Sequence, residues 1–298
     1  MMHDQAEKLR QLALSSNAIT KGTIIKKNCH SNNSRVITVT SGKGGVGKTN
    51  FTINLALALA DLKQNVLVID ADLGMANIGV VLGCSTPYSL LNLLEDSKTM
   101  GDIVSDGPRG IKFIAGGSGM YHLANLSEIQ LQYIIRQISF FDDWADFILI
   151  DTGAGLSKNV LNFVMAADEV IVITTPEPTA ITDAYAMMKV YAGNQGYAPL
   201  RLVVNRITEL AEGQMVVDKL TQVSLRFLTL PVNNLGFVFE DRNMVKAVKM
   251  QTPLLISFPQ SIASRCIQGI ASRLLKGEKT AQPSGIRVFL EKIFNFRR

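Results

Sequence analysis

Residues 42–49 read Gly42-Lys-Gly-Gly-Val-Gly-Lys-Thr49, and the expected fold of the whole chain follows from them. They come directly after the apolar run Arg35-Val-Ile-Thr-Val-Thr40, which predicts a buried strand, and before an apolar helix predicted from Asn50 to Leu62. A glycine-rich loop in this position lets backbone N–H groups surround a phosphate chain, and the following helix points its N-terminal dipole at the same anion. The loop therefore predicts a nucleotide-binding P-loop.

Each residue type in this loop has an expected role. Lys48 is expected to neutralise the β- and γ-phosphate oxygens, and the Thr49 hydroxyl is placed to hold Mg²⁺. Phosphate binding alone does not require Lys43, which by itself is consistent with a solvated surface charge. A glycine-rich turn without a ligand is the alternative, and the flanking strand and helix argue against it. The predicted nucleotide-binding residues here are Gly42, Gly44, Gly45, Val46, Gly47, Lys48, Thr49 and Asn50.

Composition and charge limit the classes of function. The chain has 298 residues and is 47% hydrophobic, and no apolar run approaches the roughly 18 residues that span a bilayer. Its three cysteines lack paired spacing, so we expect neither disulfides nor a zinc site, and a cytoplasmic setting. The net charge of +5 combines +4 in residues 1–35 and +3 in residues 286–298 with −2 in the residues between them, so the basic character belongs to the tails. A basic face for nucleic acid on the central domain is therefore not expected.

Further apolar runs predict a doubly wound α/β fold. Strands are expected at Asn65 to Ile69, Ile111 to Ala115, Phe147 to Ile150, Glu169 to Thr174 and Arg201 to Val204, with segments of helical length between them. Continuously apolar strands alternating with helices predict a mainly parallel sheet with helices on both faces. We also expect a strand at Leu225 to Leu230 and a closing helix at Ser261 to Leu275. The predicted layout is an N-terminal extension (1–34), a catalytic domain (35–275), a linker (276–285) and a C-terminal amphipathic helix (286–298).

Lys43 and the second strand resemble the MinD/ParA family of SIMIBI ATPases, which carry a deviant Walker A motif. In that family the lysine matching Lys43 reaches across a nucleotide-sandwich dimer to the phosphates of the partner. The segment Val68-Ile-Asp-Ala-Asp-Leu-Gly-Met-Ala-Asn77 is similar to the family's switch I, in which Asp72 positions the attacking water. Asp70 lies at the same strand end, so it is either a Mg²⁺ ligand or a structural, helix-capping carboxylate.

Two later segments extend the resemblance. Ile148-Leu-Ile-Asp-Thr-Gly-Ala-Gly155 is similar to the family's Walker B and switch II, with Asp151 ordering Mg²⁺ through water. Gly153 stands where the family usually has Pro, so we expect a more flexible switch II. Asn205 in Val203-Val-Asn-Arg206 resembles an adenine-reading asparagine, and Arg206 follows it. The resemblance implies ATP and Mg²⁺ as cofactors and a catalytic set of Lys43, Lys48, Asp72 and Asp151.

The C-terminal tail predicts an amphipathic helix. Its apolar residues recur at i, i+3, i+4, i+7 and i+8 and are Ile286, Phe289, Leu290, Ile293 and Phe294. One interpretation is a helix docked on the domain's own core, which is expected in a closed monomer. The positive charge, the aromatic content and the preceding linker favour a helix that lies in the surface of an anionic membrane. The tail also resembles the membrane-targeting tail of the MinD branch.

The N-terminal tail reads Asp4-Gln-Ala-Glu-Lys-Leu-Arg-Gln-Leu12 and predicts a short capped helix, although a disordered extension is the alternative. It resembles the Asp-Gln-Ala-x-x-Leu-Arg motif of the flagellar branch of the family, FlhG (also FleN or YlxH), which engages the SRP-type GTPase FlhF. The matching residues are Asp4, Gln5, Ala6, Leu9 and Arg10. The resemblance to this branch implies an ATP-dependent homodimer on the inner face of the cell membrane, at the pole, that regulates flagellar number and placement.

The same resemblance implies further partners, and other functions are alternatives to it. Flagellar C-ring proteins and a flagellar transcriptional regulator are additional candidate partners, and no nucleic acid is expected. A division-site or DNA-partitioning ATPase is one alternative, and it would have no use for the N-terminal motif. A nucleotide-binding adaptor without turnover is another. A nitrogenase-type redox role is disfavoured, because Cys84 has no suitably placed second cysteine.

Overall fold

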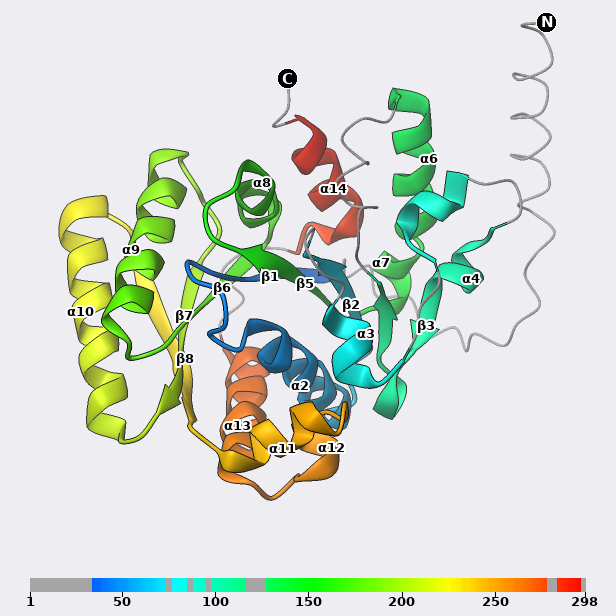
Figure 1. Cartoon of the computed structure of the whole chain (residues 1–298). Helices are drawn as coiled ribbons and strands as arrows, with labels where there is room; N and C mark the ends of the chain where they lie inside the picture. Colours follow the sequence, from blue (N-terminus) through cyan, green and yellow to red (C-terminus); the bar gives the residue numbers. More distant parts are fainter. Residues whose placement is uncertain are drawn as a thin grey trace, which may run out of the picture. The chain divides into compact units, whose positions relative to one another are not determined.

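The computed structural model describes residues 34–72, 77–84, 88–94, 98–115, 127–277 and 283–295. All of these belong to one compact unit, Asn32–Arg298. Its strands are β1 (Arg35–Ser41), β2 (Val66–Ala71), β3 (Val104–Asp106), β4 (Lys112–Ile114), β5 (Phe147–Ala154), β6 (Glu169–Thr174), β7 (Leu200–Ile207) and β8 (Val232–Phe239). They form one sheet in the order β3-β4-β2-β5-β1-β6-β7-β8 (Figure 1). Only β3, at one edge, runs antiparallel to its neighbour.

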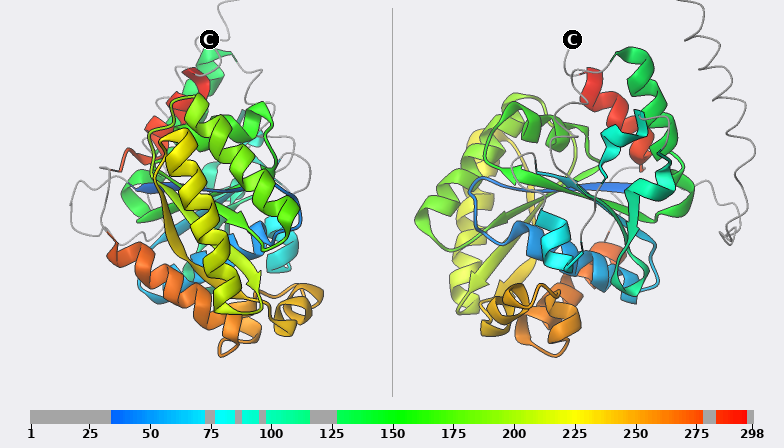
Figure 2. Two further views of the ribbon diagram at one scale, coloured as in Figure 1. Left: turned by 90° about the vertical axis from the view of Figure 1, so that its left-hand side faces the viewer. Right: turned by 45° about the vertical axis from the view of Figure 1, so that its right-hand side comes forward.

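Helices cover both faces of this sheet (Figures 1 and 2). On one face lie α2 (Lys48–Asp61), α3 (Asn77–Leu82), α11 (Arg242–Lys249), α12 (Leu254–Ser257) and α13 (Ile262–Lys276). On the other face lie α6 (Glu128–Ile138), α7 (Phe141–Trp144), α8 (Lys158–Ala166), α9 (Pro178–Gly193), α10 (Leu210–Leu228) and α14 (Gly285–Asn295). The shorter elements are α4 (Met100–Ile103) and the 3-10 turns η1 (Leu90–Leu94) and η2 (Pro108–Gly110).

The central strands are buried from both sides, as their continuously apolar sequences predict. Neighbouring residues of β1 enter opposite halves of the core: Val36 packs under one helical layer and Ile37 under the other. This is the pattern of a parallel strand covered on both faces. The predicted doubly wound, mainly parallel α/β fold is therefore confirmed. No helix in the described part of the chain is both long and apolar enough to cross a membrane.

One expected strand is wrong. The run from Leu225 to Leu228 continues α10, and Thr229 ends that helix with a left-handed φ of 54°. The side chains of Leu225 and Phe227 are 62% and 65% exposed, so their apolar character does not mark a buried strand. The last strand, β8, begins only after Pro231, at Val232.

The C-terminal helix α14 packs its apolar face on its own domain. It contacts α6, α7, α8 and β1. Phe289 stacks on Phe163 of α8, with ring centroids 6.3 Å apart. The buried residues of its apolar face, none more than 6% exposed, are Ile286, Phe289, Leu290 and Ile293. The predicted membrane face is thus part of the core in this structure, and the Phe294 side chain lies outside what the structure describes.

Asp142 of α7 holds the first turn of α14. Its Oδ1 accepts hydrogen bonds from the Ile286 N–H at 2.7 Å and from the Ser34 hydroxyl at 2.7 Å. Its Oδ2 accepts a longer bond from the Arg287 N–H at 3.3 Å. A Cβ on Gly285, where φ is +81°, would lie 2.6 Å from Asp142 Oδ1, so this close approach requires glycine. Asp142 therefore caps α14 although the two are far apart in sequence.

Asp168 holds the residue before α14 in the same way. It accepts hydrogen bonds from the N–H of Ser284 at 3.1 Å and from its hydroxyl at 2.5 Å. Its other oxygen accepts the Val36 N–H at the start of β1. Burial raises the pKa of Asp168 above its ordinary value. The predicted partner motif, Asp4 to Leu12, lies outside the described residues.

Candidate nucleotide site

The strands of the sheet end where the predicted site residues lie. The P-loop leaves β1 and enters α2, Asp72 follows β2 directly, and Asn205 lies near the end of β7. In the β2–β5 register Asp70 lies beside Asp151. The carboxyl ends of parallel strands form the usual ligand crevice of an open α/β sheet. The fold thus brings the predicted core site residues to one edge.

Glycine is required at two positions of the P-loop. A Cβ on Gly42 would lie 2.2 Å from the carbonyl group of Asp183 in α9, so the loop could not pack there. Gly47 has a φ of +93°, and a Cβ on it would lie 2.6 Å from Asn205 Nδ2. That amide donates a hydrogen bond to the Val46 carbonyl at 2.7 Å. Asn205 therefore positions the phosphate loop, a role that its adenine-reading prediction did not include.

Asp151 and Lys48 form a buried charged pair below the loop. Lys48 Nζ lies 3.6 Å from Asp151 Oδ1, and the Thr52 hydroxyl donates to the same oxygen at 3.1 Å. Burial raises the pKa of Asp151, and the charge of Lys48 and a hydrogen bond with the Thr49 side chain oppose this rise. Asp151 Oδ2 is buried and has no hydrogen-bond partner among the described residues. A buried, unsatisfied carboxylate oxygen beside a threonine hydroxyl is a donor set that fits Mg²⁺.

Asp70 already uses both carboxylate oxygens. Oδ1 accepts the Asp72 N–H at 3.0 Å, and Oδ2 accepts the Ile78 N–H at 3.2 Å. Burial, helped by the nearby charge of Asp151, raises the pKa of Asp70 to about 7 against the effect of these two hydrogen bonds. The contacts give Asp70 a structural role at both ends of the segment between β2 and α3. Its coordination of Mg²⁺ stays a prediction.

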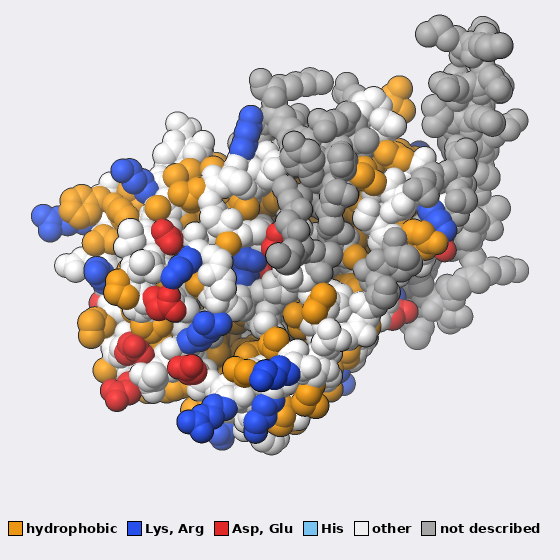
Figure 3. Space-filling view, viewed as in Figure 1, with side chains coloured by type: hydrophobic (Ala, Val, Ile, Leu, Met, Phe, Trp, Pro, Cys, Tyr) orange, Lys and Arg blue, Asp and Glu red, His pale blue; other side chains and the backbone are white. Residues whose placement is uncertain are grey.

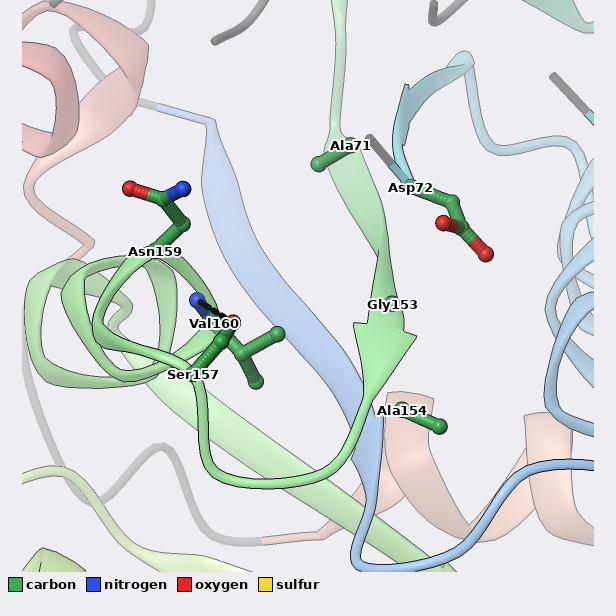
Figure 4. Close-up of a pocket in the computed structure, with 7 residues that line it drawn as sticks. All are labelled: Ala71, Asp72, Gly153, Ala154, Ser157, Asn159 and Val160. Atoms are coloured by element: carbon green, nitrogen blue, oxygen red, sulfur yellow. Dashed lines mark hydrogen bonds between the residues drawn. The ribbon is translucent and has the colours of Figure 1, made fainter. Parts of the chain in front are cut away.

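Asp72 borders a pocket of about 200 Å³. Figure 4 shows Asp72 on one side of this pocket and Ser157 on the other, with Gly153 on the strand between them. A Cβ on Gly153 would lie 3.4 Å from Asp72 Oδ1, an ordinary van der Waals distance, so the two residues are neighbours across the pocket. The full lining is Ala71, Asp72, Gly153, Ala154, Ser157, Asn159 and Val160. A carboxylate at the rim of such a pocket can orient a water molecule.

Lys43 is paired within its own chain. Its Nζ lies 2.9 Å from Glu177 Oε2 and 2.8 Å from the Thr179 hydroxyl. The Lys43 hydrogen bond and charge lower the pKa of Glu177, and the charge of Arg206 lowers it further. Arg206 itself is exposed and has a left-handed φ of 59°. In this structure Lys43 is thus held by the residues that begin α9.

Comparisons with known proteins identify the family. Residues 34–192 match the family model described as an AAA domain. The chain is 38% identical to the antiactivator FleN of Pseudomonas aeruginosa, covering 87% of this chain and 93% of FleN. It is 31% identical to the flagellum site-determining protein YlxH of Helicobacter pylori, covering 89% of this chain and 91% of YlxH. The septum site-determining protein MinD of Pyrococcus horikoshii, solved as a complex with Mg-ADP, aligns with a TM-score of 0.64 at 25% identity, covering 83% and 99% of the two chains.

The chain belongs to the MinD/ParA family of ATPases. Its likeness to FleN and YlxH confirms the predicted resemblance to the flagellar branch. In this MinD/ParA-family chain, the sequence did not indicate that Glu177 and Thr179 are the partners of Lys43. They lie 134 and 136 residues from it in the chain. One signal for them was present: both follow the carboxyl end of the predicted strand Glu169 to Thr174, at the same sheet edge as the P-loop.

Proposed function

We propose that this chain is an ATP-dependent switch that dimerises, binds the membrane and regulates flagellar number and placement through an FlhF-type SRP GTPase. The likeness to FleN and YlxH, which covers nearly nine-tenths of the chain, carries the flagellar part of the proposal. The unsatisfied Asp151 oxygen beside Lys48 and Thr49 carries the nucleotide part.

Hydrolysis is assigned to residues at the edge of the sheet. Thr49 and Asp151 would hold Mg²⁺, which supplies neutralisation of the phosphate charge when bound. The P-loop backbone and Lys48 bind and neutralise the phosphate oxygens, and Asn205 keeps the loop in place through Val46. Asp72 orients the attacking water at the rim of its pocket. Turnover by purified protein tests this assignment, and binding of ATP without hydrolysis would favour the adaptor alternative.

The ATP-bound dimer requires Lys43 to leave its present partners. A lysine that contacts the nucleotide of a second subunit cannot remain bonded to Glu177 and Thr179 of its own chain. The pair is solvent-exposed, so breaking it costs little free energy. Glu177 therefore competes with dimer formation without preventing it. The phosphate charge in the facing subunit is the stronger partner for Lys43.

Membrane attachment requires α14 to leave the core. Four buried side chains each contribute roughly 1.5–3 kcal/mol of apolar transfer energy, and an interfacial position in a bilayer recovers much of it. The free energies of α14 docked on the core and inserted in the membrane are therefore similar. Two such helices on one dimer raise the avidity of membrane binding. Removing residues 286–298 should abolish ATP-dependent sedimentation with anionic vesicles. Because α14 fills the core, this truncation should also lower the stability of the domain.

The N-terminal motif is proposed to act on the GTPase. About two to three turns of helix are too short to persist alone in water, so the segment should order on contact with its partner. Gln5 and Arg10 would make polar contacts, while Leu9 and Leu12 pack in an apolar groove. A peptide of residues 1–20 should stimulate GTP hydrolysis by an FlhF-type GTPase, and Gln5→Ala with Arg10→Ala should remove the effect. Stimulation by the full chain but not by the peptide would assign the activity to the folded domain.

A second candidate function is control of a flagellar transcriptional regulator. The relative FleN is named as an antiactivator, and it is 38% identical to this chain. The two functions are compatible, because one nucleotide switch can present different surfaces in its two states. Binding of the purified chain to a flagellar activator, with ADP and with ATP, would test this candidate. A partitioning or division-site ATPase would instead require DNA or a MinE-like activator for turnover.

A further inference from the structure

Helix α11 presents apolar and basic side chains outside the nucleotide site. Val245, Val248 and the adjoining Met250 are 58%, 46% and 59% exposed. Exposed cations lie between and beside them, at Arg242, Lys246 and Lys249. We call these six residues the α11 surface. Within α11 Ala247 is buried and Met244 packs against the core, while five of the eight residues are exposed.

The cations of the α11 surface outnumber the acidic residues beside them in the chain. None of the three forms an ion pair in the part of the chain that the structure describes. Two acidic residues, Glu240 and Asp241, precede the helix, and the Asp241 carboxylate accepts hydrogen bonds from the N–H groups of Asn243 and Ala263. In Figure 3 Lys and Arg side chains gather with hydrophobic ones at the lower edge of the molecule, where Figure 1 places α11 to α13. The surface is therefore complementary to negative charge.

The position of α11 decides which anionic partner fits. Within the domain α11 and α12 lie on the outer side of α2 and α13, at a projecting corner (Figures 1 and 2). A partner helix needs a groove to bury its apolar face, whereas a bilayer accepts projecting aliphatic side chains surrounded by cations. We propose that the α11 surface is a second membrane contact, with Val245, Val248 and Met250 entering an anionic bilayer and the cations at its headgroups.

The proposal rests on the proposed membrane function and specifies which face of the domain meets the lipid. The reach of the chain permits both contacts on one bilayer. Helix α13 runs from Ile262, just after α12, to Lys276, and its 15 residues span about 22 Å. Nine peptide steps connect Lys276 to Gly285, and they reach about 30 Å when extended. A released α14 can therefore return along α13 to the plane of the α11 surface.

The direct test places a tryptophan on the α11 surface of the full chain. The single tryptophan, Trp144, is first replaced by Phe, and Val248→Trp is then introduced. Vesicles of phosphatidylcholine and phosphatidylglycerol with brominated acyl chains should quench Trp fluorescence at position 248 in the presence of ATP and Mg²⁺. The matched control is Leu225→Trp on α10, where the wild-type side chain is 62% exposed, and it should stay unquenched.

A second measurement tests the charges. Lys246→Glu with Lys249→Glu should weaken sedimentation with anionic vesicles about tenfold or more, since each lysine near such a surface contributes to binding. Lys189→Glu with Lys219→Glu makes the same charge change on exposed positions of α9 and α10 and should have a smaller effect. Light scattering with ATP verifies that the variants still dimerise. If a charge variant no longer dimerises, the fluorescence quenching at position 248 is the result that tests the proposal.

The outcomes separate this inference from the proposed function. If the chain sediments with anionic vesicles while position 248 is no more quenched than position 225, the α11 surface serves another partner and the inference is overturned. If truncation after residue 285 leaves both sedimentation and quenching intact, the proposal for the α11 surface is supported and α14 is not the membrane anchor. If the full chain binds no vesicles, both proposals fail.

Discussion

Asp142 offers a direct way to shift α14 between its docked and released states. Asp142→Ala removes the acceptor of the Ile286 and Arg287 N–H groups and leaves every apolar residue of α14 unchanged. Losing a helix N-cap typically costs about 1 kcal/mol and up to about 2. A cost of roughly 1–2 kcal/mol shifts the docking equilibrium about 5- to 30-fold toward the released helix.

The assay is the affinity for anionic vesicles at a fixed ATP concentration. Asp142→Ala should raise it by up to the same factor, because release of α14 precedes its insertion in the bilayer. Amide exchange in residues 285–295 should accelerate in parallel. Asp143→Ala is the matched control, since Asp143 is the exposed neighbour and accepts no hydrogen bond within the described residues. Faster exchange in α14 without tighter vesicle binding would refute the view that docking competes with the membrane.

Three further changes test the site and the core. Lys48→Ala should abolish ATP binding, whereas Asp72→Ala should keep binding and accumulate an ATP-bound dimer; a monomeric Asp72→Ala protein in light scattering with ATP would contradict the sandwich dimer. Glu177→Gln should lower the ATP concentration needed for dimerisation by a few-fold, since it weakens the exposed contact that holds Lys43, and an unchanged midpoint would show that the pair does not compete. Because burial raises the pKa of Asp168, its stabilising contribution is complete below the ordinary unfolded value of about 3.9 and is lost as pH rises through the raised folded value. Urea unfolding should therefore show Asp168→Asn gaining stability relative to wild type as the pH rises from about 4 through the raised folded pKa, and a constant difference would argue against the raised pKa.

The sheet and the P-loop were predictable because their information is local. Apolar runs that are buried on both faces predict strands wherever they stand, and the glycine spacing from Gly42 to Gly47 requires the loop conformation directly. The strand predicted at Leu225 to Leu230 is wrong because these apolar residues continue an amphipathic helix. The buried face of that helix includes Val217 and Leu220. Short apolar runs do not distinguish these two structures.

Contacts between distant residues set the limit of the sequence argument. The sequence predicted an amphipathic α14 with a docked and a membrane-bound interpretation, but the stacking of Phe289 on Phe163 depends on the packing of α8. In the same way, Asn205 supports the P-loop only because β7 ends beside it. Tertiary packing brings these residues together, and no spacing along the chain encodes it.

The docked position of α14 has a consequence for biosynthesis. Its side chains complete a core that includes Val36 at the beginning of β1 and Phe163 in α8. Residues 285–295 leave the ribosome after the other elements of this core, so the emerging domain has uncovered apolar surface until they follow. Nascent chains should therefore remain sensitive to proteases and chaperones until α14 has emerged, and truncation before residue 285 should reduce the yield of folded protein.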